Sequence, residues 1–332
     1  MSSQDAFDEL PLSEQAARLQ PLAERAVSEF GLAPHSSVSM HWLGENAIFS
    51  VKDSASSDRY ALRIHRPRYR TDDQIKSEIA WMTSLREGVP GVPEARAGPD
   101  GEYLRTVAAT GVPEPRQCDL LTWIDATPLR RLEPADALPM MGEVMAKIHQ
   151  HGRTWQRPGW FTRLSWGFDD LVGTKPRLGD YTKVELDGEV RRLLDRTMAE
   201  VRLRLADCST DSDSFGLIHA DYLDNNLFAD NGNAVILDFD ECGFGWFTYD
   251  LATLRVKGRS LTDDANWMAM FLDSYRRRSD LALTNLSALP AFMAARAVGM
   301  VGWMYGRGSY AEKFRKPIVD DAIYRAKALL GG

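Results

Sequence analysis

The residues with the clearest chemical spacing lie in the second half of the chain. His219, Asp221 and Asn226 form the pattern His-x-Asp-x-x-x-x-Asn, the skeleton of a phosphoryl-transfer catalytic loop. In such a loop the aspartate accepts the proton of the acceptor hydroxyl and the asparagine holds a divalent metal ion. A second acid, Asp238, follows at the end of the apolar run 235–237. The spacing therefore indicates an acid–base residue and two metal ligands on one short segment.

The stretch between the two expected metal ligands predicts a β-hairpin. It carries an Asn-Gly pair at residues 231–232 between two apolar runs, and this pair is a strong short-range signal for a hairpin turn. A hairpin there would deliver the acid–base residue and both metal ligands from one compact unit. The elements that position this unit must come from the rest of the chain.

Two portions of different character follow from the periodicity of the apolar residues. Up to residue 124 the chain predicts short strands with one internal helix, and beyond it long helices dominate. We expect a frayed tail at 1–10 and an irregular segment at 152–181. The predicted strands are 38–43, 47–51, 60–65, 103–108 and 118–124, and the predicted helices are 13–30, 72–86, 134–151, 184–206, 249–257, 263–278, 289–305 and 318–330.

This order of elements predicts the domain organisation. Strands followed by helices indicate an α+β protein of two lobes. We expect residues 1–34 to form an N-terminal tail and helix, and residues 35–124 to form a small β-rich lobe. Residues 125–332 would form a larger, mainly helical lobe with the catalytic loop and the acceptor site.

Composition and charge argue against several other classes of protein. The chain has 332 residues, of which 44% are hydrophobic and 26% charged, as in an ordinary globular protein. Its formal net charge of −7 argues against a general nucleic-acid-binding protein, which would carry a basic excess. The three cysteines are widely spaced and form no Cys-x-x-Cys pair, which favours free thiols in a reducing cytoplasm.

Neither the N-terminus nor the most apolar stretch predicts a membrane partner. The first residues are acidic and lack the basic and apolar regions of a signal peptide. The apolar stretch 288–305 is interrupted by Arg296 and several glycines, so we expect a buried helix rather than a membrane span. The Gly-x-x-x-Gly pattern at 302–306 favours close helix packing. The sequence therefore predicts a cytoplasmic protein without a membrane or nucleic-acid partner.

These motifs together resemble the aminoglycoside phosphotransferase family, also described as the phosphotransferase enzyme family. Within it, the sequence is most similar to the branch of homoserine-kinase-type and stress-response-kinase-like enzymes. The resemblance covers roughly residues 35–255 and implies a protein-kinase-like bilobal fold that uses ATP and Mg²⁺. The matching segments are 44–46, 60–63, the helix that carries Glu78, 219–226, 236–239 and 249–252.

The resemblance implies a role for each residue of the catalytic segment. Asp221 is similar to the catalytic base of the family, and His219 to the structural member of its catalytic loop. Asn226 and Asp238 correspond to the Mg²⁺ ligands, whose oxygens suit this hard cation. Asp250 corresponds to a buried acid that braces the loop, although taken alone it could be a simple helix N-cap.

Nucleotide contacts are implied in the first lobe. Arg63 falls where related kinases place the strand lysine that contacts the ATP phosphates, and Glu78 falls where its helix partner lies. Arginine keeps the charge of that lysine but changes its geometry, because a guanidinium fork is not a point charge. The other expected contacts come from backbone groups, at Gly44, Glu45 and Asn46 over the phosphates and at Thr122 and Ile124 beside the adenine.

The phosphate acceptor is the open question at this stage. Asp224, Asp240 and Glu241 could attract a small amine-bearing alcohol, such as an amino alcohol, homoserine or an aminoglycoside, or they could be solvated loop charges. A Ser/Thr protein kinase of the stress-response type shares the same motifs. Against it, we find no segment typical of an activation loop between Asp238 and Tyr249. A nucleotide-binding pseudokinase is the third hypothesis, and the intact acid–base and metal residues argue against it.

Overall fold

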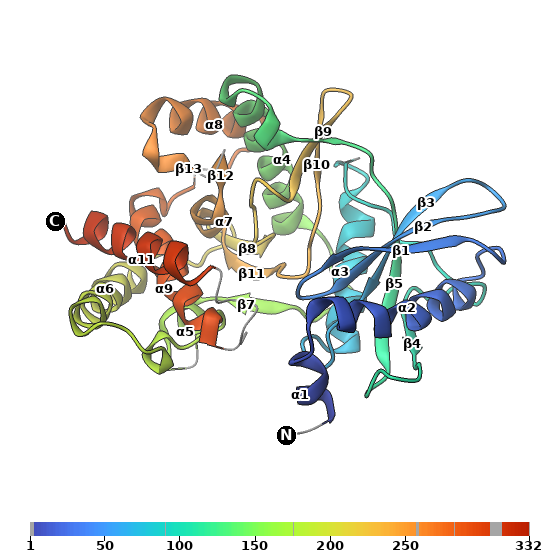
Figure 1. The fold of residues 1–332 in the computed structure, drawn as a ribbon. Coiled ribbons are helices and arrows are strands. Elements are labelled where there is room, and N and C mark those ends of the chain that lie inside the picture. The colour runs from blue at the N-terminus through green and yellow to red at the C-terminus, as the bar shows by residue number, and fades with distance from the viewer. Residues whose placement is uncertain are drawn as a thin grey trace. The chain divides into compact units, whose positions relative to one another are not determined.

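The computed structural model describes residues 3–89, 91–174, 176–256, 259–281, 283–305 and 314–331. The chain divides into two compact units, which Figure 1 colours along the sequence. The first unit comprises Met1–Ala126 and Arg157–Thr162. The second unit comprises Thr127–Gln156 and Arg163–Gly332.

A five-stranded antiparallel sheet forms the centre of the first unit, in the order β1-β2-β3-β5-β4. Strand β2 buries Ala47, Phe49 and Val51 on one face, the period of two that a half-buried strand requires. All five strands confirm the predicted strands, with shifts of a few residues at their ends. Their bounds are β1 Ser37–Leu43, β2 Ala47–Lys52, β3 Arg59–Ile64, β4 Arg105–Val107 and β5 Arg116–Thr122.

Helices α2 (Leu12–Glu29) and α3 (Asp72–Leu85) confirm the two helices predicted in this unit. The apolar face of α2 joins the same core as the inner face of the sheet, with Leu22 and Ala26 fully buried. Helix α3 begins at a capping box in which Thr71 and Gln74 satisfy each other's backbone N–H groups.

The expectation of a frayed N-terminal tail is wrong. Helix α1 spans Ser3–Asp8, and the side chain of Phe7 is only 3% exposed. Gln4 is also buried, and its side-chain oxygen accepts a hydrogen bond from Arg116 at 2.9 Å. One buried aromatic ring and one buried polar contact hold this short segment, and neither is visible in its acidic sequence.

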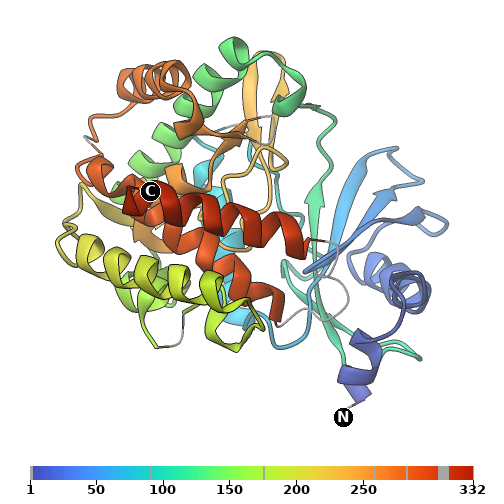
Figure 2. The same ribbon diagram turned by 60° about the vertical axis from the view of Figure 1, so that its left-hand side comes forward.

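Helices dominate the second unit (Figures 1 and 2). Helix α9 packs against α6, α7 and α11, and helix α4 packs against α8. These helices confirm the predicted ones within a few residues, although α7 ends at Thr253 and the final predicted residue, Lys257, lies outside the described residues. The bounds are α4 Pro134–Thr154, α5 Phe168–Val172, α6 Gly188–Ala206, α7 Phe247–Thr253, α8 Ala265–Arg278, α9 Leu289–Tyr305 and α11 Arg315–Leu330.

Small sheets connect these helices to the catalytic segment. One has the order β7-β11-β8, another β10-β9-β6, and β12 pairs with β13. Strands β7 and β11 were not predicted, because both are short, β11 contains two glycines, and their parallel pairing joins residues far apart in the sequence. The bounds are β6 Thr127–Pro128, β7 Leu164–Trp166, β8 Phe215–Ile218, β9 Leu227–Asp230, β10 Asn233–Ile236, β11 Gly243–Trp246, β12 Arg255–Val256 and β13 Arg259–Ser260.

One helical stretch among the described residues, Leu286–Met304, is long and apolar enough to cross a membrane by length and composition. Most of that stretch, 61%, is buried inside the protein. Ala291, Phe292 and Val301 within it are fully buried. This burial is typical of the core helix of a folded unit, as the sequence predicts.

Candidate functional site

The carboxylate of Asp221 lies between an amide and a guanidinium, and its side chain is 21% exposed. Oδ2 accepts a hydrogen bond from Asn226 Nδ2 at 3.2 Å, and the same Nδ2 donates to the Asp221 carbonyl at 3.0 Å. Oδ1 accepts from Arg296 Nη2 at 2.6 Å, while Arg296 Nη1 donates to the Ala220 carbonyl at 3.2 Å. Asp221 is therefore held in one orientation and still reaches solvent.

Arg296 was not predicted as a site residue. Burial opposes its charge, but Tyr249 and Asp221 outweigh that effect and raise the pKa of Arg296 above its usual value. It is therefore a permanent cation beside the Asp221 carboxylate. The sequence signal was present, because a single arginine inside an apolar helix needs an acidic partner when the helix is buried.

Asp250 holds the backbone immediately before Asp221. Its carboxylate is fully buried and accepts hydrogen bonds from the N–H groups of His219 (2.9 Å) and Ala220 (2.6 Å). His149 Nε2 lies 3.0 Å from the same carboxylate, and His149 Nδ1 lies 2.9 Å from the Tyr275 hydroxyl. Ala220 has a φ of 64°, a left-handed conformation that costs about 1–3 kcal/mol outside glycine. These hydrogen bonds stabilise that conformation.

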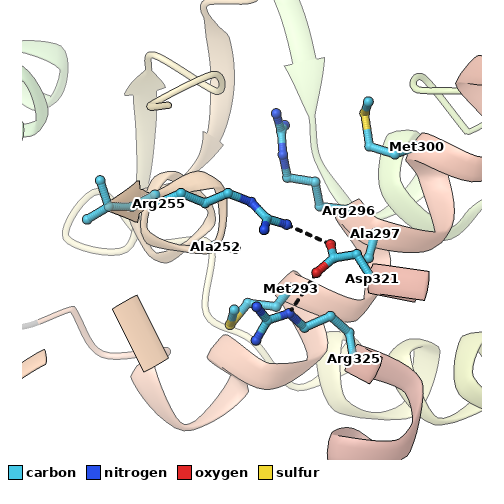
Figure 3. A pocket seen from close by; sticks show the side chains of 9 residues that line it. Ala252, Arg255, Met293, Arg296, Ala297, Met300, Asp321 and Arg325 are labelled. Atoms are coloured by element: carbon cyan, nitrogen blue, oxygen red, sulfur yellow. Dashed lines mark hydrogen bonds and ion pairs between the residues drawn. The ribbon is translucent and has the colours of Figure 1, made fainter. Parts of the chain in front are cut away.

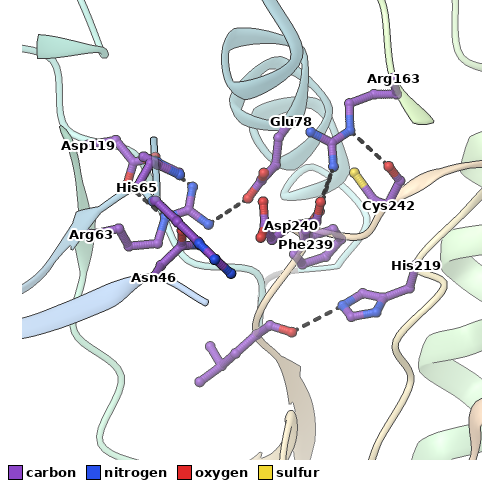
Figure 4. Close-up of polar contacts among 12 residues, drawn as sticks. Asn46, Arg63, His65, Glu78, Asp119, Arg163, His219, Phe239, Asp240 and Cys242 are labelled. Atoms are coloured by element: carbon purple, nitrogen blue, oxygen red, sulfur yellow. Dashed lines mark hydrogen bonds and ion pairs between the residues drawn. The ribbon is translucent and has the colours of Figure 1, made fainter. Parts of the chain in front are cut away.

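His219 connects the catalytic loop to the hairpin, as Figure 4 shows. Nε2 lies 3.0 Å from the Leu237 carbonyl, which can only accept, so Nε2 carries the proton. Nδ1 accepts the Asp221 N–H at 3.3 Å, so this ring is the neutral Nε2–H tautomer. The ring thus positions Asp221 relative to the residue that precedes Asp238.

The predicted hairpin is confirmed. Strands β9 and β10 pair antiparallel, and Asn231 and Gly232 have φ values of 49° and 80°, as a type I′ turn requires. Beyond the last strand pair, the Leu237 N–H donates to the Asn226 carbonyl at 2.9 Å. The two predicted metal ligands, Asn226 and Asp238, therefore lie side by side at the base of the hairpin.

The donor set at this position fits Mg²⁺. Because Asn226 Nδ2 donates to Asp221, its Oδ1 is the side-chain atom that could coordinate a metal ion, and that atom also accepts from Asn225 at 3.2 Å. Asp238 has a φ of 65°, so its backbone is held in a rarely adopted conformation. One amide and one carboxylate oxygen suit Mg²⁺, which keeps waters and phosphate oxygens as its other ligands.

Arg163 fixes the segment that follows Asp238, and no sequence signal indicated it. Its guanidinium donates to the carbonyls of Cys242 (2.8 Å), Phe239 (3.1 Å) and Asp240 (2.6 Å), as drawn in Figure 4. One side chain thus satisfies three carbonyls of a tight loop. The contact joins residues more than 75 positions apart, which explains why a local pattern does not reveal it.

The three acids considered for the acceptor have different environments. Asp240 is buried, whereas Asp224 is half-buried in the turn that precedes Asn226. The Glu241 carbonyl accepts a hydrogen bond from Trp166 Nε1 at 2.8 Å. Burial raises the pKa of the Tyr249 phenol to about 12, and the charges of Asp221 and Glu241 contribute to that increase. Tyr249 thus lies within the electrostatic reach of both acids.

In the first unit, the structure brings Arg63 and Glu78 together and adds an acid that was not predicted. Arg63 Nη1 donates to Glu78 Oε1 at 2.6 Å (Figure 4). Its Nε and Nη2 donate to both carboxylate oxygens of Asp119, at 2.8 and 2.6 Å. His65 Nε2 lies 3.1 Å from the same carboxylate. Asp119 could have been noticed, because it is a charged residue inside an apolar strand.

Two members of this cluster, Arg63 and Asp119, keep their charges although they are buried. Burial raises the pKa of Asp119, but Arg63 and His65 outweigh that effect and hold the pKa of this carboxyl well below its usual range. Burial likewise opposes the Arg63 charge, and Asp119 and Glu78 raise the pKa of Arg63 well above its usual value. The pairing of strands β3 and β5 explains the contact between Arg63 and Asp119, because these two residues lie directly opposite each other.

The turn between β1 and β2 is closed by its own backbone. The Gly44 N–H donates to the Asn46 carbonyl at 3.1 Å, and Asn46 Oδ1 accepts from the Arg66 N–H at 3.3 Å. Glu45 Oε2 lies 3.7 Å from Arg66 Nη1. A Cβ added at Gly44 would lie 2.6 Å from Nε1 of the exposed Trp42 side chain, which would have to shift.

Of the two residues predicted beside the adenine, Thr122 has its amide bonded to the segment before β4. Its N–H donates to the Glu94 carbonyl at 2.8 Å, and its hydroxyl accepts from the Glu94 N–H at 2.9 Å. Ile124 lies beyond the end of β5 and is half-buried. The Trp123 N–H likewise donates to a carbonyl of the chain, that of Arg59, at 2.9 Å.

Comparisons with known proteins agree with these motifs. A model described as the phosphotransferase enzyme family matches residues 43–288. Amicoumacin kinase from Bacillus subtilis is 23% identical over 280 residues, which are 79% of this chain and 77% of that protein. Both this family and the mixed sheet-and-helix architecture are those expected from the sequence.

Two solved structures show the same fold. The microcompartment-associated aminopropanol kinase superposes with a TM-score of 0.79 at 26% identity and covers 93% of this chain and 96% of its own. Amicoumacin kinase hAmiN, solved with AMP-PNP, Ca²⁺ and Ami, gives a TM-score of 0.74 at 19% identity over 93% and 96% of the two chains. The α+β protein-kinase-like fold is thereby confirmed.

Proposed function

This chain belongs to the phosphotransferase enzyme family and is a kinase, and we propose that it transfers the γ-phosphate of ATP to a hydroxyl of a small, amine-bearing metabolite. The observation that carries this proposal is the environment of Asp221. Its backbone is braced by Asp250, its carboxylate is oriented by Asn226 and Arg296, and one hydrogen bond links the hairpin base to Asn226.

In this proposal Asp221 orients the acceptor hydroxyl and accepts its proton. Transfer of a phosphoryl group demands little covalent chemistry from the protein, so correct positioning supplies most of the rate enhancement. The contact with Arg296 fixes the direction of the carboxylate before the acceptor arrives. Its positive charge lies against the carboxylate, which is the form of Asp221 that accepts a proton.

Asn226 and Asp238 would hold Mg²⁺ through one amide oxygen and one carboxylate oxygen. When bound, the ion would neutralise charge on the phosphate oxygens during transfer. The relative hAmiN was solved with AMP-PNP and Ca²⁺, which supports the use of a nucleotide and a divalent cation. Mg²⁺ is the ion that this small, oxygen-only donor set suits.

Nucleotide binding is assigned to the first unit. Arg63 would contact the phosphates with the part of its guanidinium that faces neither Glu78 nor Asp119, and the Gly44–Asn46 turn would cover them. Because the Thr122 amide is committed to Glu94, the adenine contact is assigned to the backbone of Ile124. A buried, doubly paired Arg63 would act as a fixed positive group rather than as a mobile one.

The acceptor is proposed to be small rather than a protein. The segment between Asp238 and Tyr249 contains strand β11, which pairs with β7 on one side and β8 on the other. It is therefore short and paired, unlike the long activation loop of protein kinases. The named relatives, an aminopropanol kinase and amicoumacin kinases, also have small molecules in their names.

An acceptor panel tests this function. ADP release is measured with Mg²⁺, ATP and a set of amino alcohols, homoserine and aminoglycosides, and the phosphorylated product is identified by ³¹P NMR. We expect at least one compound to raise turnover well above the rate without acceptor. Labelling of peptides or proteins alone would contradict the small-molecule proposal and favour the protein-kinase alternative.

A further inference from the structure

A small pocket in the second unit is rich in arginine (Figure 3), and one of its lining residues, Arg296, contacts Asp221. It is formed by the residues at and after the end of α7, by α9 and by α11. Its cavity volume is about 40 Å³, more than one water molecule needs. The lining residues are Ala252, Leu254, Arg255, Met293, Arg296, Ala297, Met300, Asp321 and Arg325.

Arg296 connects this pocket to the catalytic base. It lines the pocket, and its Nη2 donates to Asp221 Oδ1 at 2.6 Å. A molecule in the pocket is therefore separated from the base by a single side chain. A short acceptor could place its hydroxyl at Asp221 and another polar group in the pocket.

The side chains of the lining favour one kind of polar group. Three arginines face the pocket against one acid, so the lining carries a formal charge of +2. Asp221 and Asp263 offset this charge from outside the lining, through Arg296 and Arg325. With these two acids counted, the three arginines are matched by three carboxylates, so hydrogen bonding decides the preference. Guanidinium groups only donate hydrogen bonds, which suits an anion and not an ammonium group.

The existing contacts show how a carboxylate would bind here. Asp321 bridges two of the arginines: Arg255 Nη2 donates to Oδ2 at 2.6 Å, and Arg325 Nε lies 3.5 Å from Oδ1. Arg325 Nη1 lies 3.4 Å from Asp263 Oδ1, and both Arg325 distances exceed the usual 2.9 Å or so of an N–H···O bond. The Arg255 side chain is 37% exposed and so is accessible to a ligand.

From these observations we propose that the pocket of Arg255, Arg296 and Arg325 binds a carboxylate of the acceptor. This inference rests on the proposed function, because it treats the pocket as part of the acceptor site. The acceptor class then narrows to hydroxy amino acids, whose hydroxyl lies at Asp221 and whose carboxylate binds the arginines. The planar guanidinium fork can bind a carboxylate through two parallel hydrogen bonds.

Matched acceptor pairs test the inference. Each pair contains the same amino alcohol with and without a carboxylate: serine and ethanolamine, homoserine and 3-aminopropanol, threonine and 1-amino-2-propanol. We expect the carboxylate-bearing member of at least one pair to have the higher kcat/KM. In Arg255→Gln, that preference should decrease about 10- to 100-fold, as expected for the loss of one charge-assisted hydrogen bond.

A control variant and a binding measurement separate the possible outcomes. Arg204→Gln removes an arginine of similar exposure that pairs with Glu200 on α6, and it should leave the preference unchanged. Calorimetry with Mg²⁺ and AMP-PNP measures acceptor binding without turnover, so the pocket is tested even if no compound in these pairs is phosphorylated. Preference for the carboxylate-free members, equal losses for both members in Arg255→Gln, or absence of binding by both would each overturn the inference.

Discussion

Arg63 is held by two carboxylates rather than by the single glutamate that a kinase-like motif suggests. Asp119 takes two of its N–H groups and Glu78 a third, all within 2.8 Å. Both carboxylates are fully buried, so the charges compensate one another in a region that water does not reach. Removing one partner from such a cluster leaves an uncompensated charge, which costs more than the pair itself contributes.

The variant Asp119→Asn tests this cluster. It should lower the free energy of unfolding by about 3–5 kcal/mol at pH 7, since one carboxylate partner of a buried arginine is lost. Asp125→Asn, which disrupts an exposed pair with Arg59, should cost less than about 1 kcal/mol. Urea unfolding of the two variants measures the difference, and equal losses would contradict the burial argument.

The ion pair between Arg63 and Asp119 also predicts how the stability of the protein depends on pH. Arg63 and His65 hold the pKa of Asp119 below its unfolded value despite burial, so the stabilisation is present above the unfolded pKa of about 3.9. It is lost as pH falls through the lower folded pKa. The difference in the free energy of unfolding between wild type and Asp119→Asn should therefore be constant from about pH 5 to 8. It should become smaller in stronger acid. A gap that widens in acid would refute this assignment.

At the scale of elements, helix α9 combines packing with chemistry. It carries Arg296, which binds Asp221, and its Gly302 lies against a neighbouring loop. A Cβ added at Gly302 would lie 2.2 Å from the backbone carbon of Gly179. The glycine pattern predicted close packing, and Gly302 confirms it, whereas Gly306 lies outside the described residues.

Gly302→Ala should therefore destabilise the protein by about 1–3 kcal/mol, because a backbone segment cannot yield as a side chain does. Gly188→Ala, at the first residue of α6, is the matched helical control. Its nearest neighbour would be the flexible end of Arg192 at 3.5 Å, so we expect no loss of stability. Chemical denaturation compares the two, and a neutral Gly302→Ala would show that α9 can move away from the loop.

Sequence patterns predicted the elements whose signals are local. The strands of the first unit and the hairpin at 227–236 follow from alternation and from one Asn-Gly turn. Strands β7 and β11 depend on parallel pairing across nearly eighty residues, so nothing in their own sequence marks them. The N-terminal helix α1 depends on the burial of Phe7, which is likewise a tertiary effect.

For the whole molecule, the distinction between local and long-range contacts also separates the expected site residues from those that were not predicted. His219, Asp221, Asn226 and Asp238 are close in sequence, so their spacing alone indicated phosphoryl transfer. Arg163, Arg296 and Asp119 reach their partners across 56 to 79 residues, and only the folded chain brings them together. The family could thus be identified from one segment. Arg296 and Asp119 stand out as charges within apolar elements, but only the structure shows which residues they pair with.

The central claim is that Asp221 acts as the base of a kinase whose metal and nucleotide sites do not depend on its charge. The most direct measurement compares turnover and Mg²⁺·ATP binding in wild type and Asp221→Asn, an isosteric change that removes the proton acceptor. We predict that kcat falls at least about 100-fold, in line with the contribution of general-base catalysis, while the calorimetric Kd for Mg²⁺·ATP stays within about threefold. Turnover near the wild-type rate would contradict the account.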